Sequence, residues 1–233
     1  MNQKDKLLAN RIYLILAALF IASLVTSNLI FQKFFFWYPF QIEVYGVKLF
    51  EVSVGLLPYP LTFLITDILS EIYGKRKANE VVIAGIFASF FSLLIIYVSK
   101  EVPATSWSQV NDGMFVNVFG AAPLAVLASM MAYLFAQFID IRVYHFWKNI
   151  TQGKHLWLRN NFSTFSSQFI DTATVLILLC SFGIINWDKF SGLMISGVVF
   201  KIMIAILDTP FLYLFVFAFR KRFNLKVNED ILD

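Results

Sequence analysis

Six windows of about twenty mostly apolar residues dominate this chain, and each is long enough to form a helix across the roughly 30 Å hydrocarbon layer of a membrane. They cover residues 12–31, 50–72, 79–99, 122–146, 162–185 and 193–219. Of the 233 residues, 59% are hydrophobic and only 15% are charged, whereas about 25% are charged in soluble domains. The pattern predicts an all-α integral membrane protein with six transmembrane helices and excludes an ordinary soluble enzyme.

The positive charges favour one orientation in the membrane. Fourteen of the 19 Lys and Arg residues lie before the first window, between the second and third, around the connection of the fourth to the fifth, or after the sixth. Because Lys and Arg accumulate on the cytoplasmic side of membrane proteins, we expect both termini in the cytoplasm. This orientation accounts for the formal net charge of +4, and no nucleic-acid partner is expected. No long linker divides the chain, so we expect residues 1–233 to form a single domain.

Two connections on the opposite side are longer than a minimal turn. Residues 33–49 include Gln41-Ile42-Glu43-Val44-Tyr45, whose alternation predicts a short hairpin or an interfacial segment. Residues 100–120 include Trp107, which we expect at the level of the lipid headgroups. Each connection is interpreted either as a simple link or as part of an outer lid.

The sequence offers little for covalent or metal chemistry. The single cysteine, Cys180, provides neither a disulfide nor a thiolate cluster, and there is no Walker motif, so no metal or cofactor is expected. An intramembrane enzyme that uses two of Asp67, Asp171 and Asp208 is the alternative. It lacks support, because the chain has neither a Gly-x-Gly-Asp motif nor a His-Glu-x-x-His pair. We therefore expect that the protein is not an enzyme.

Ionisable residues inside the windows indicate function, because a charge near the membrane centre costs about 2.5 to 3.5 kcal/mol. Asp171 is the strongest case, since it lies about 15 Å into the membrane when counted from Asn161 along a helix. Asn161, Gln168 and Asp171 recur at intervals of seven and three residues and therefore share one helix stripe. The stripe predicts a surface that binds a solute.

The second and fourth windows add buried polar groups near their ends. Asp67 and Glu71 share one face of the second window. Glu71 is also explained by pairing with the basic residues 75–77, whereas Asp67 lies one turn deeper. In the fourth window, Gln137 and Asp140 are explained either by contact with solute or by pairing with nearby basic residues. Those basic residues are Arg142, Lys148 and Arg159.

The sixth window contributes Lys201 and Asp208, which are seven residues apart. Lys201 either pairs with an acid such as Asp171 to stabilise packing or faces the solute. Pro210 is expected to kink this helix, and further interruptions occur at Pro58-Tyr59-Pro60 and Ser27-Asn28. Interrupted helices line the solute sites of many transporters. We therefore expect a polar cavity between the first, second, fifth and sixth helices.

Three groups of residues, in order along the chain, resemble the motifs of one family. They are Pro58-Tyr59-Pro60-Leu61-Thr62-Phe63 with Thr66-Asp67 and Glu71-Ile72-Tyr73-Gly74, then Arg159-Asn160-Asn161 with Ser167-Gln168-Phe169-Ile170-Asp171, and then Lys201 with Leu207-Asp208-Thr209-Pro210. The combination resembles the queuosine precursor transporter family, also called the vitamin uptake transporter or VUT family, over essentially the whole chain. Ser27-Asn28 and Lys33 also fit this pattern.

The resemblance implies a six-helix protein of the bacterial or archaeal cytoplasmic membrane, similar in architecture to the substrate-binding subunits of energy-coupling-factor transporters. It implies import of 7-deazaguanines such as preQ0 and preQ1, the precursors of the modified tRNA base queuosine. The preferred precursor and the coupling ion are left open. The alternative is a subunit that binds a purine-like or vitamin solute and needs separate ATPase subunits. The implied partners are the small-molecule base and membrane lipids, and a homo-oligomer is left open.

The chemistry of a deazaguanine suggests roles for the polar residues. Its N1–H and exocyclic amine are paired donors that a carboxylate accepts, and an amide can donate to its O6 carbonyl. We expect Asp171 to be the acceptor and Gln168 or Asn161 to supply the amide. Candidate aromatic faces for the flat base are Tyr59, Phe63, Phe162 and Phe165. The full set of predicted substrate-binding residues is Asp171, Gln168, Asn161, Asn28, Asp67, Glu71, Lys201 and Asp208.

Overall fold

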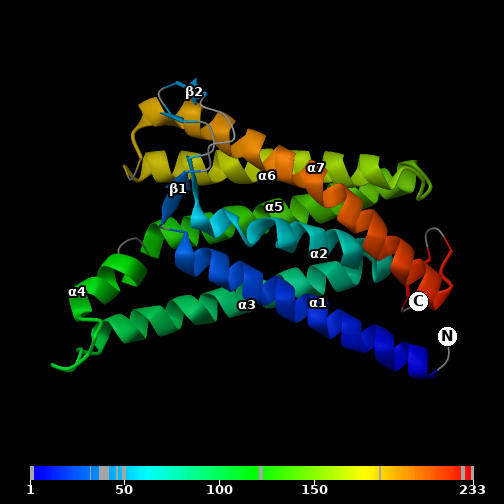
Figure 1. Ribbon diagram of the computed structural model, residues 1–233, viewed down its shortest axis with the longest axis horizontal. Coiled ribbons are helices and arrows are strands. Elements are labelled where there is room, and N and C mark those ends of the chain that lie inside the picture. The colour runs from blue at the N-terminus through cyan, green and yellow to red at the C-terminus, as the bar shows by residue number, and fades with distance from the viewer. Residues whose placement is uncertain are drawn as a thin grey trace.

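Long helices make up most of the protein, as its computed structural model shows (Figure 1). The structure describes residues 3–31, 33–36, 42–45, 47–48, 51–120, 123–183, 185–226 and 229–231. The five long helices are α1 (Gln3–Ile30), α3 (Gly74–Glu101), α5 (Pro123–Ile150), α6 (Leu156–Ser181) and α7 (Phe190–Phe223), and α2 (Tyr59–Ile72) is about half as long. The nearly all-helical class predicted from the sequence is therefore confirmed.

Four of the helical segments in the described part of the chain are long and apolar enough to cross a membrane. They are Gln3–Ile30, Gly74–Glu101, Leu156–Ser181 and Trp187–Phe223. A helix of 28 residues, such as α1 or α3, is about 42 Å long at 1.5 Å per residue and exceeds the hydrocarbon thickness of about 30 Å. The large side chains on the outer face of α3, such as Phe87 and Phe91, are exposed, as expected for a surface that contacts lipid. These features establish a multi-pass membrane protein.

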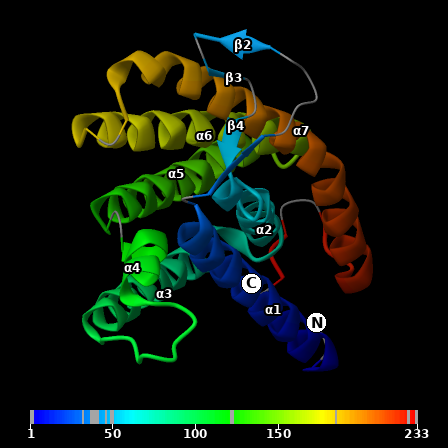
Figure 2. The same cartoon turned by 60° about the vertical axis from the view of Figure 1, so that its left-hand side comes forward.

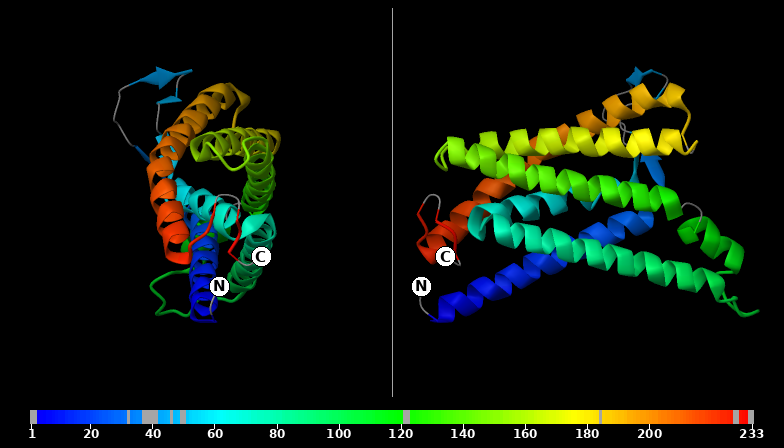
Figure 3. Two further views of the ribbon diagram at one scale, coloured as in Figure 1. Left: turned by 90° about the vertical axis from the view of Figure 1, so that its right-hand side faces the viewer. Right: turned by 180° about the vertical axis from the view of Figure 1, so that it is seen from behind.

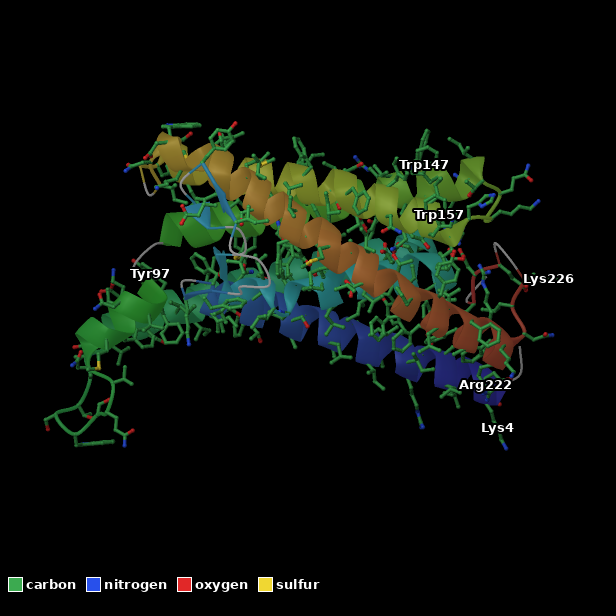
Figure 4. The ribbon with its side chains drawn as sticks, turned by 45° about the horizontal axis from the view of Figure 1, so that its top comes forward. Lys4, Tyr97, Trp147, Trp157, Arg222 and Lys226 are labelled. Atoms are coloured by element: carbon green, nitrogen blue, oxygen red, sulfur yellow. The ribbon has the colours of Figure 1, made fainter. Side chains whose placement is uncertain are left out.

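The two ends of the chain lie at the same end of the bundle (Figure 1). An ion pair joins them, with Arg222 Nη2 of α7 3.0 Å from Asp5 Oδ1 of α1. Figure 4 shows Lys4, Arg222 and Lys226 together at this end, whereas Tyr97 of α3 lies at the other. Basic residues from sequence positions far apart thus gather at one end, which is the grouping that the charge pattern predicts.

The second apolar window is not a single helix, so the expectation of a helix from residue 50 is wrong. Residues Glu51–Ser53 form strand β4, Val54–Leu56 form a 3-10 turn, and α2 begins only at Tyr59. Two prolines explain the late start: Pro58 caps α2 and Pro60 lies in its first turn, where a missing N–H is tolerated. Strand β4 pairs antiparallel with β1 (Phe34–Phe36), which follows α1.

A short hairpin is present where the alternating stretch predicts one. Strand β2 (Glu43–Val44) pairs antiparallel with β3 (Val47–Lys48), beside α7 at the end away from the termini (Figure 2). Gln41 and Gly46 lie outside the described residues. The other long connection contains the short helix α4 (Asp112–Phe115) and is exposed over residues 101–114, so this part does not cover the bundle as a lid would.

The remaining helices pack around α2. Helices α5 and α6 run side by side, and α7 crosses them obliquely (Figure 3). Helix α7 includes Pro210 within its length, and a kink at this residue stays a prediction. On the other side, α1 and α3 cross closely at Gly85, where an added Cβ would lie 2.8 Å from the ring of Phe20. This arrangement places polar faces of α2, α5, α6 and α7 towards one another.

Candidate functional site

A cavity of about 190 Å³ lies between α1, the segment before α2, α5, α6 and α7. Much of its wall is apolar, with side chains such as Val52, Leu176 and Leu193. Its polar lining comes from Ser27, Asn28, Tyr59, Tyr133, Asp171 and Lys201. Pockets for drug-sized ligands usually measure roughly 300 to 1,000 Å³, so this cavity suits a smaller molecule.

An ion pair between α6 and α7 forms one wall of the cavity. Lys201 Nζ lies 2.5 Å from Asp171 Oδ2 and donates to Thr172 Oγ1 at 3.0 Å. Both charged side chains are buried, and Lys201 Nζ also lies 5.0 Å from the centre of the Tyr59 ring. The predicted pairing of Lys201 with Asp171 is therefore confirmed, and both residues also line the cavity.

Two buried polar atoms of cavity-lining residues have no hydrogen-bond partner in the described part of the chain. They are Oδ1 of Asp171, an acceptor, and Nδ2 of Asn28, a donor. A buried polar group left unsatisfied costs about 1 to 3 kcal/mol, so native proteins rarely keep one without a use. The cavity therefore offers one acceptor and one donor to a bound molecule.

Aromatic rings form a further part of the cavity. The rings of Tyr59 and Tyr133 lie 4.7 Å apart at 58°, and Phe63 packs behind both, at 5.5 and 5.9 Å. Of the predicted aromatic candidates, Tyr59 lines the cavity, whereas Phe162 is exposed and packs against Trp147. Figure 4 shows Trp147 near the end of the bundle that carries Trp157.

The sequence interpretation missed Tyr133 as a lining residue. A signal for it existed, because Tyr133, Gln137 and Asp140 are the polar members of one face of α5, spaced by four and then three residues. In the structure Gln137 Nε2 donates to Tyr133 Oη at 2.8 Å. The polar stripe of α5 therefore reaches the cavity at one end.

Irregular backbone between α1 and α2 closes the cavity on one side. Ser27 Oγ donates to the carbonyl of Gly55, and Ser53 Oγ donates to the carbonyl of Phe31. The N–H of Val54 donates to the carbonyl of Lys33 at 2.7 Å. Only glycine fits at position 55, since an added Cβ would lie 2.7 Å from the Ser27 carbonyl oxygen. These described groups of the non-helical segment are thus paired with one another or with α1, which lowers the cost of placing them in a membrane.

Three of the predicted site residues lie outside the lining of the cavity. Gln168 and Asp208 border a space of about 20 Å³ that also touches Lys201, which is room for about one water molecule. Asn161 donates to Thr209 Oγ1 of α7 at 3.1 Å and to a backbone carbonyl of its own helix. The predicted stripe on α6 therefore divides: Asp171 lines the cavity and Asn161 joins α6 to α7.

Glu71 lies in a separate cluster at the end of the bundle that holds the termini. Its Oε1 lies 2.6 Å from Arg159 Nη2 and also pairs with Arg220, and its Oε2 accepts from Tyr144 Oη at 3.0 Å. Lys148 Nζ lies 3.8 Å away. We call these five residues the inner cluster.

The prediction that Glu71 pairs with residues 75–77 is wrong. Arg76 and Lys77 instead pair with Glu80 within their own helix, because α3 turns their side chains away from α2.

The chain's C-terminal segment closes the inner cluster. The N–H of Ile231 donates to the carbonyl of Ile72 at 2.8 Å, and Asp230 Oδ1 lies 3.5 Å from Lys148 Nζ. Gly74, with a φ of +80°, turns the chain from α2 into α3 at this point. An added Cβ at Gly74 would collide with the Asp230 carboxylate. The inner cluster is therefore packed from all these sides.

Asp67 and Asp140 lie between the cavity and the inner cluster along α2 and α5. Asp140 Oδ1 accepts from Ser167 Oγ of α6 at 2.9 Å, rather than pairing with any of the basic residues proposed for it. Gln137, likewise, contacts Tyr133 and lies 3.2 Å from Thr66 Oγ1. Polar groups of α2, α5 and α6 thus form a continuous buried core.

A multi-pass helical bundle that encloses a small, polar-lined cavity, with one discontinuous pass beside it, is the architecture of a membrane transporter for small solutes. The sequence model of the family described as "Putative vitamin uptake transporter" matches residues 53–215. Because the match covers more than half of the chain, this protein belongs to that family.

A curated relative gives the family a more specific context. It is a protein of Bacillus subtilis (strain 168) named "Probable queuosine precursor transporter", which is 28% identical over 173 residues. The alignment covers 74% of this chain and 73% of the relative. No solved structure matches the chain significantly. The predicted resemblance to queuosine precursor transporters is confirmed at the level of the family.

Proposed function

We propose that this protein imports 7-deazaguanine precursors of queuosine, such as preQ0 and preQ1, and binds the base in the cavity beside Asp171. The observation that carries the proposal is the pair of unsatisfied atoms, Asp171 Oδ1 and Asn28 Nδ2, on two residues that line this cavity. The name of the Bacillus subtilis relative supports the substrate class.

The base and the cavity are chemically complementary. The N1–H and exocyclic amine of a deazaguanine are donors that a carboxylate can accept together, and the neighbouring O6 is an acceptor. We assign the donors to Asp171 and O6 to the amide of Asn28, in place of Gln168 or Asn161. Lys201 pairs with Asp171 Oδ2 at 2.5 Å and so leaves Oδ1 to the base. Tyr59 and Tyr133 provide aromatic surface for the flat ring.

The remaining predicted site residues receive other roles in this proposal. Gln168 and Asp208 border the small space beside Lys201, and we assign them to positioning Lys201. Asn161 and Glu71 contact other helices, so we assign them to holding the bundle together.

For the membrane arrangement we propose six passes, with α2 and α5 completing the four long apolar segments. Both termini then lie in the cytoplasm, because the basic end of the bundle faces inward. The cavity, bordered by β4 and the end of α1, lies towards the outer side. An arrangement like the substrate-binding subunits of energy-coupling-factor transporters is part of this proposal.

Reconstitution of the purified chain in liposomes tests the proposed function. We expect vesicles that contain the protein alone to take up tritiated preQ1 and empty vesicles to take up none. Asp171→Asn is expected to abolish uptake, whereas Asp188→Asn, a change at an exposed acid outside the cavity, is the matched control and should behave as wild type. Binding without uptake would favour a subunit that needs separate ATPase subunits. Absence of both binding and uptake would overturn the proposal.

A further inference from the structure

Two buried carboxyl groups that the proposed base contacts do not use lie midway along the bundle. Asp67 of α2 is 3% exposed and Asp140 of α5 is 0% exposed. The two carboxyl groups lie within hydrogen-bonding reach of each other. Asp67 Oδ1 and Asp140 Oδ2 have no hydrogen-bond partner among the residues that the structure describes. Each acid therefore has an acceptor oxygen for which no donor is present.

The charges around this pair do not neutralise it. Besides Asp140, the charged groups that act on Asp67 in the described chain are Asp208 of α7 and Arg159 of α6; the Tyr144 hydroxyl of α5 also interacts with it. Arg159 forms an ion pair with Glu71 instead, with its Nη2 2.6 Å from Glu71 Oε1. Asp140 Oδ1 accepts from the Ser167 hydroxyl of α6 at 2.9 Å, and the Ser163 hydroxyl of α6 also interacts with Asp140; both groups are neutral. Acids thus outnumber the bases that are free to pair with them.

Two neighbouring carboxylates that are buried in this way do not both keep their charge, and the stable state holds one proton between them. Such a proton would supply the donor that both unsatisfied oxygens lack. We propose that Asp67 and Asp140 form a proton-binding site and that the proton they exchange is the coupling ion of transport. This inference rests on the proposed import function and adds its energy source.

A chain of contacts links the acid pair to the cavity. Tyr133 lines the cavity, Gln137 Nε2 donates to the Tyr133 hydroxyl at 2.8 Å, and Gln137 Oε1 lies 3.2 Å from Thr66 Oγ1. Thr66 precedes Asp67 in α2. A base that packs on Tyr133 therefore acts on the segment that holds the proton. Occupancy of the cavity and occupancy of the acid pair are linked through this contact, as coupled transport requires.

Liposomes with an imposed pH gradient test this inference, with tritiated preQ1 as the probe. An inward gradient of about one pH unit can support up to about tenfold accumulation for each proton carried. We expect wild-type protein to accumulate the probe, and a protonophore to remove the accumulation. Asp140→Asn should still exchange internal for external preQ1, since it lies outside the cavity lining, but should no longer concentrate it. Asp67→Asn should also lose accumulation.

Matched controls separate coupling from folding. Glu80→Gln, at an acid that pairs only within α3, should accumulate the probe as wild type does. If an Asn variant does not fold, a measurement on the wild-type protein takes its place. PreQ1 is added to the protein in a weakly buffered detergent solution, and the uptake or release of protons is recorded. A pH change with a stoichiometry near one proton per base is the expected result.

The outcomes of this experiment distinguish failure of proton coupling from failure of the proposed import function. Proton coupling would be overturned if wild-type protein exchanged preQ1 but did not accumulate it in response to the pH gradient, or if a sodium gradient drove accumulation instead. Either result would leave the import function intact. Accumulation by Asp140→Asn equal to that of wild type would remove the acid pair from the mechanism. Failure of the wild-type protein to bind or exchange preQ1 would overturn the proposed function and, with it, this inference.

Discussion

The cavity and the inner cluster each centre on a buried carboxylate, yet the two carboxylates differ in what remains free. Asp171 pairs with one cation, keeps one oxygen without a partner and borders about 190 Å³ of space. Glu71 is held by Arg159, Arg220, Lys148 and Tyr144. The comparison teaches that burial and charge alone do not identify a binding site. The carboxylates themselves differ: both oxygens of Glu71 have partners, whereas Asp171 Oδ1 has none among the described residues and borders the cavity.

The largest expected effect comes from breaking the inner cluster. Arg159→Met removes a fully buried cation that pairs with Glu71 at 2.6 Å and also two bonds to the carbonyls of Gly153 and Lys154. Removing one partner of a buried ion pair costs about 3 to 5 kcal/mol. We expect a correspondingly large loss of stability, measured by thermal unfolding of the protein in detergent.

Arg222→Met is the control for that change. Arg222 pairs with Asp5 at 3.0 Å, but its side chain is largely exposed, and exposed ion pairs contribute about 0 to 1 kcal/mol. Equal unfolding temperatures for the two variants would show that the inner cluster is not a structural centre.

In the cavity, Asp171→Asn should weaken both binding and stability. The change removes the charge of an acceptor that is proposed to bind the donors of the base, and a hydrogen bond to a charged group is worth about 1.5 to 3 kcal/mol. We expect binding of preQ1 to weaken by about ten- to a hundredfold, measured by equilibrium binding to purified protein. The change also leaves the buried Lys201 without its acid partner, so a loss of thermal stability is expected as well. Unchanged binding of preQ1 would contradict the contrast between the two carboxylates.

Asn28→Ala probes the donor side of the same site with a smaller effect. Loss of one neutral hydrogen bond costs about 1 kcal/mol, which corresponds to about fivefold weaker binding. Thermal unfolding of the ligand-free protein in detergent should be nearly unchanged, because Asn28 Nδ2 has no hydrogen-bond partner among the described residues for the change to remove. A loss of thermal stability with unchanged binding of preQ1 would reassign Asn28 to packing.

The smallest effect is expected for Tyr133→Phe. The ring that lines the cavity remains, while the hydroxyl that accepts from Gln137 Nε2 is removed. Binding of preQ1 should change by less than about threefold, whereas accumulation driven by a pH gradient should fall in the same liposome assay. A large loss of binding would mean that the hydroxyl itself contacts the base.

Local sequence patterns predicted much of the fold. Apolar windows of membrane-spanning length lie within α1, α3, α5, α6 and α7, because each of these helices forms from residues that are contiguous in the chain. The alternating stretch before residue 46 likewise predicted the β2–β3 hairpin. Asp171 and Lys201 were recognisable because a charge inside an apolar window is costly by itself.

Other features depend on contacts that no local pattern contains. Glu71 is paired with Arg220, which lies 149 positions further along the chain, so its partners could not be read from its neighbours. The start of α2 was also missed, because hydropathy continues through residues 50–58 although Pro58 and Pro60 set the helix boundary. Tyr133 reaches the cavity only through the packing of α5 against α2 and α6.

The short length of α2 has a consequence for how the protein is made. Its 14 residues span about 21 Å, less than the hydrocarbon layer of about 30 Å, so in the proposed six-pass arrangement residues 51–57 complete the pass. Their backbone bonds depend on groups near the end of α1 and just beyond it, at Ser27, Phe31 and Lys33. Unpaired backbone groups cost several kcal/mol each in lipid, so this stretch cannot leave the translocation machinery alone. During biogenesis the first two passes must enter the bilayer as one assembled unit.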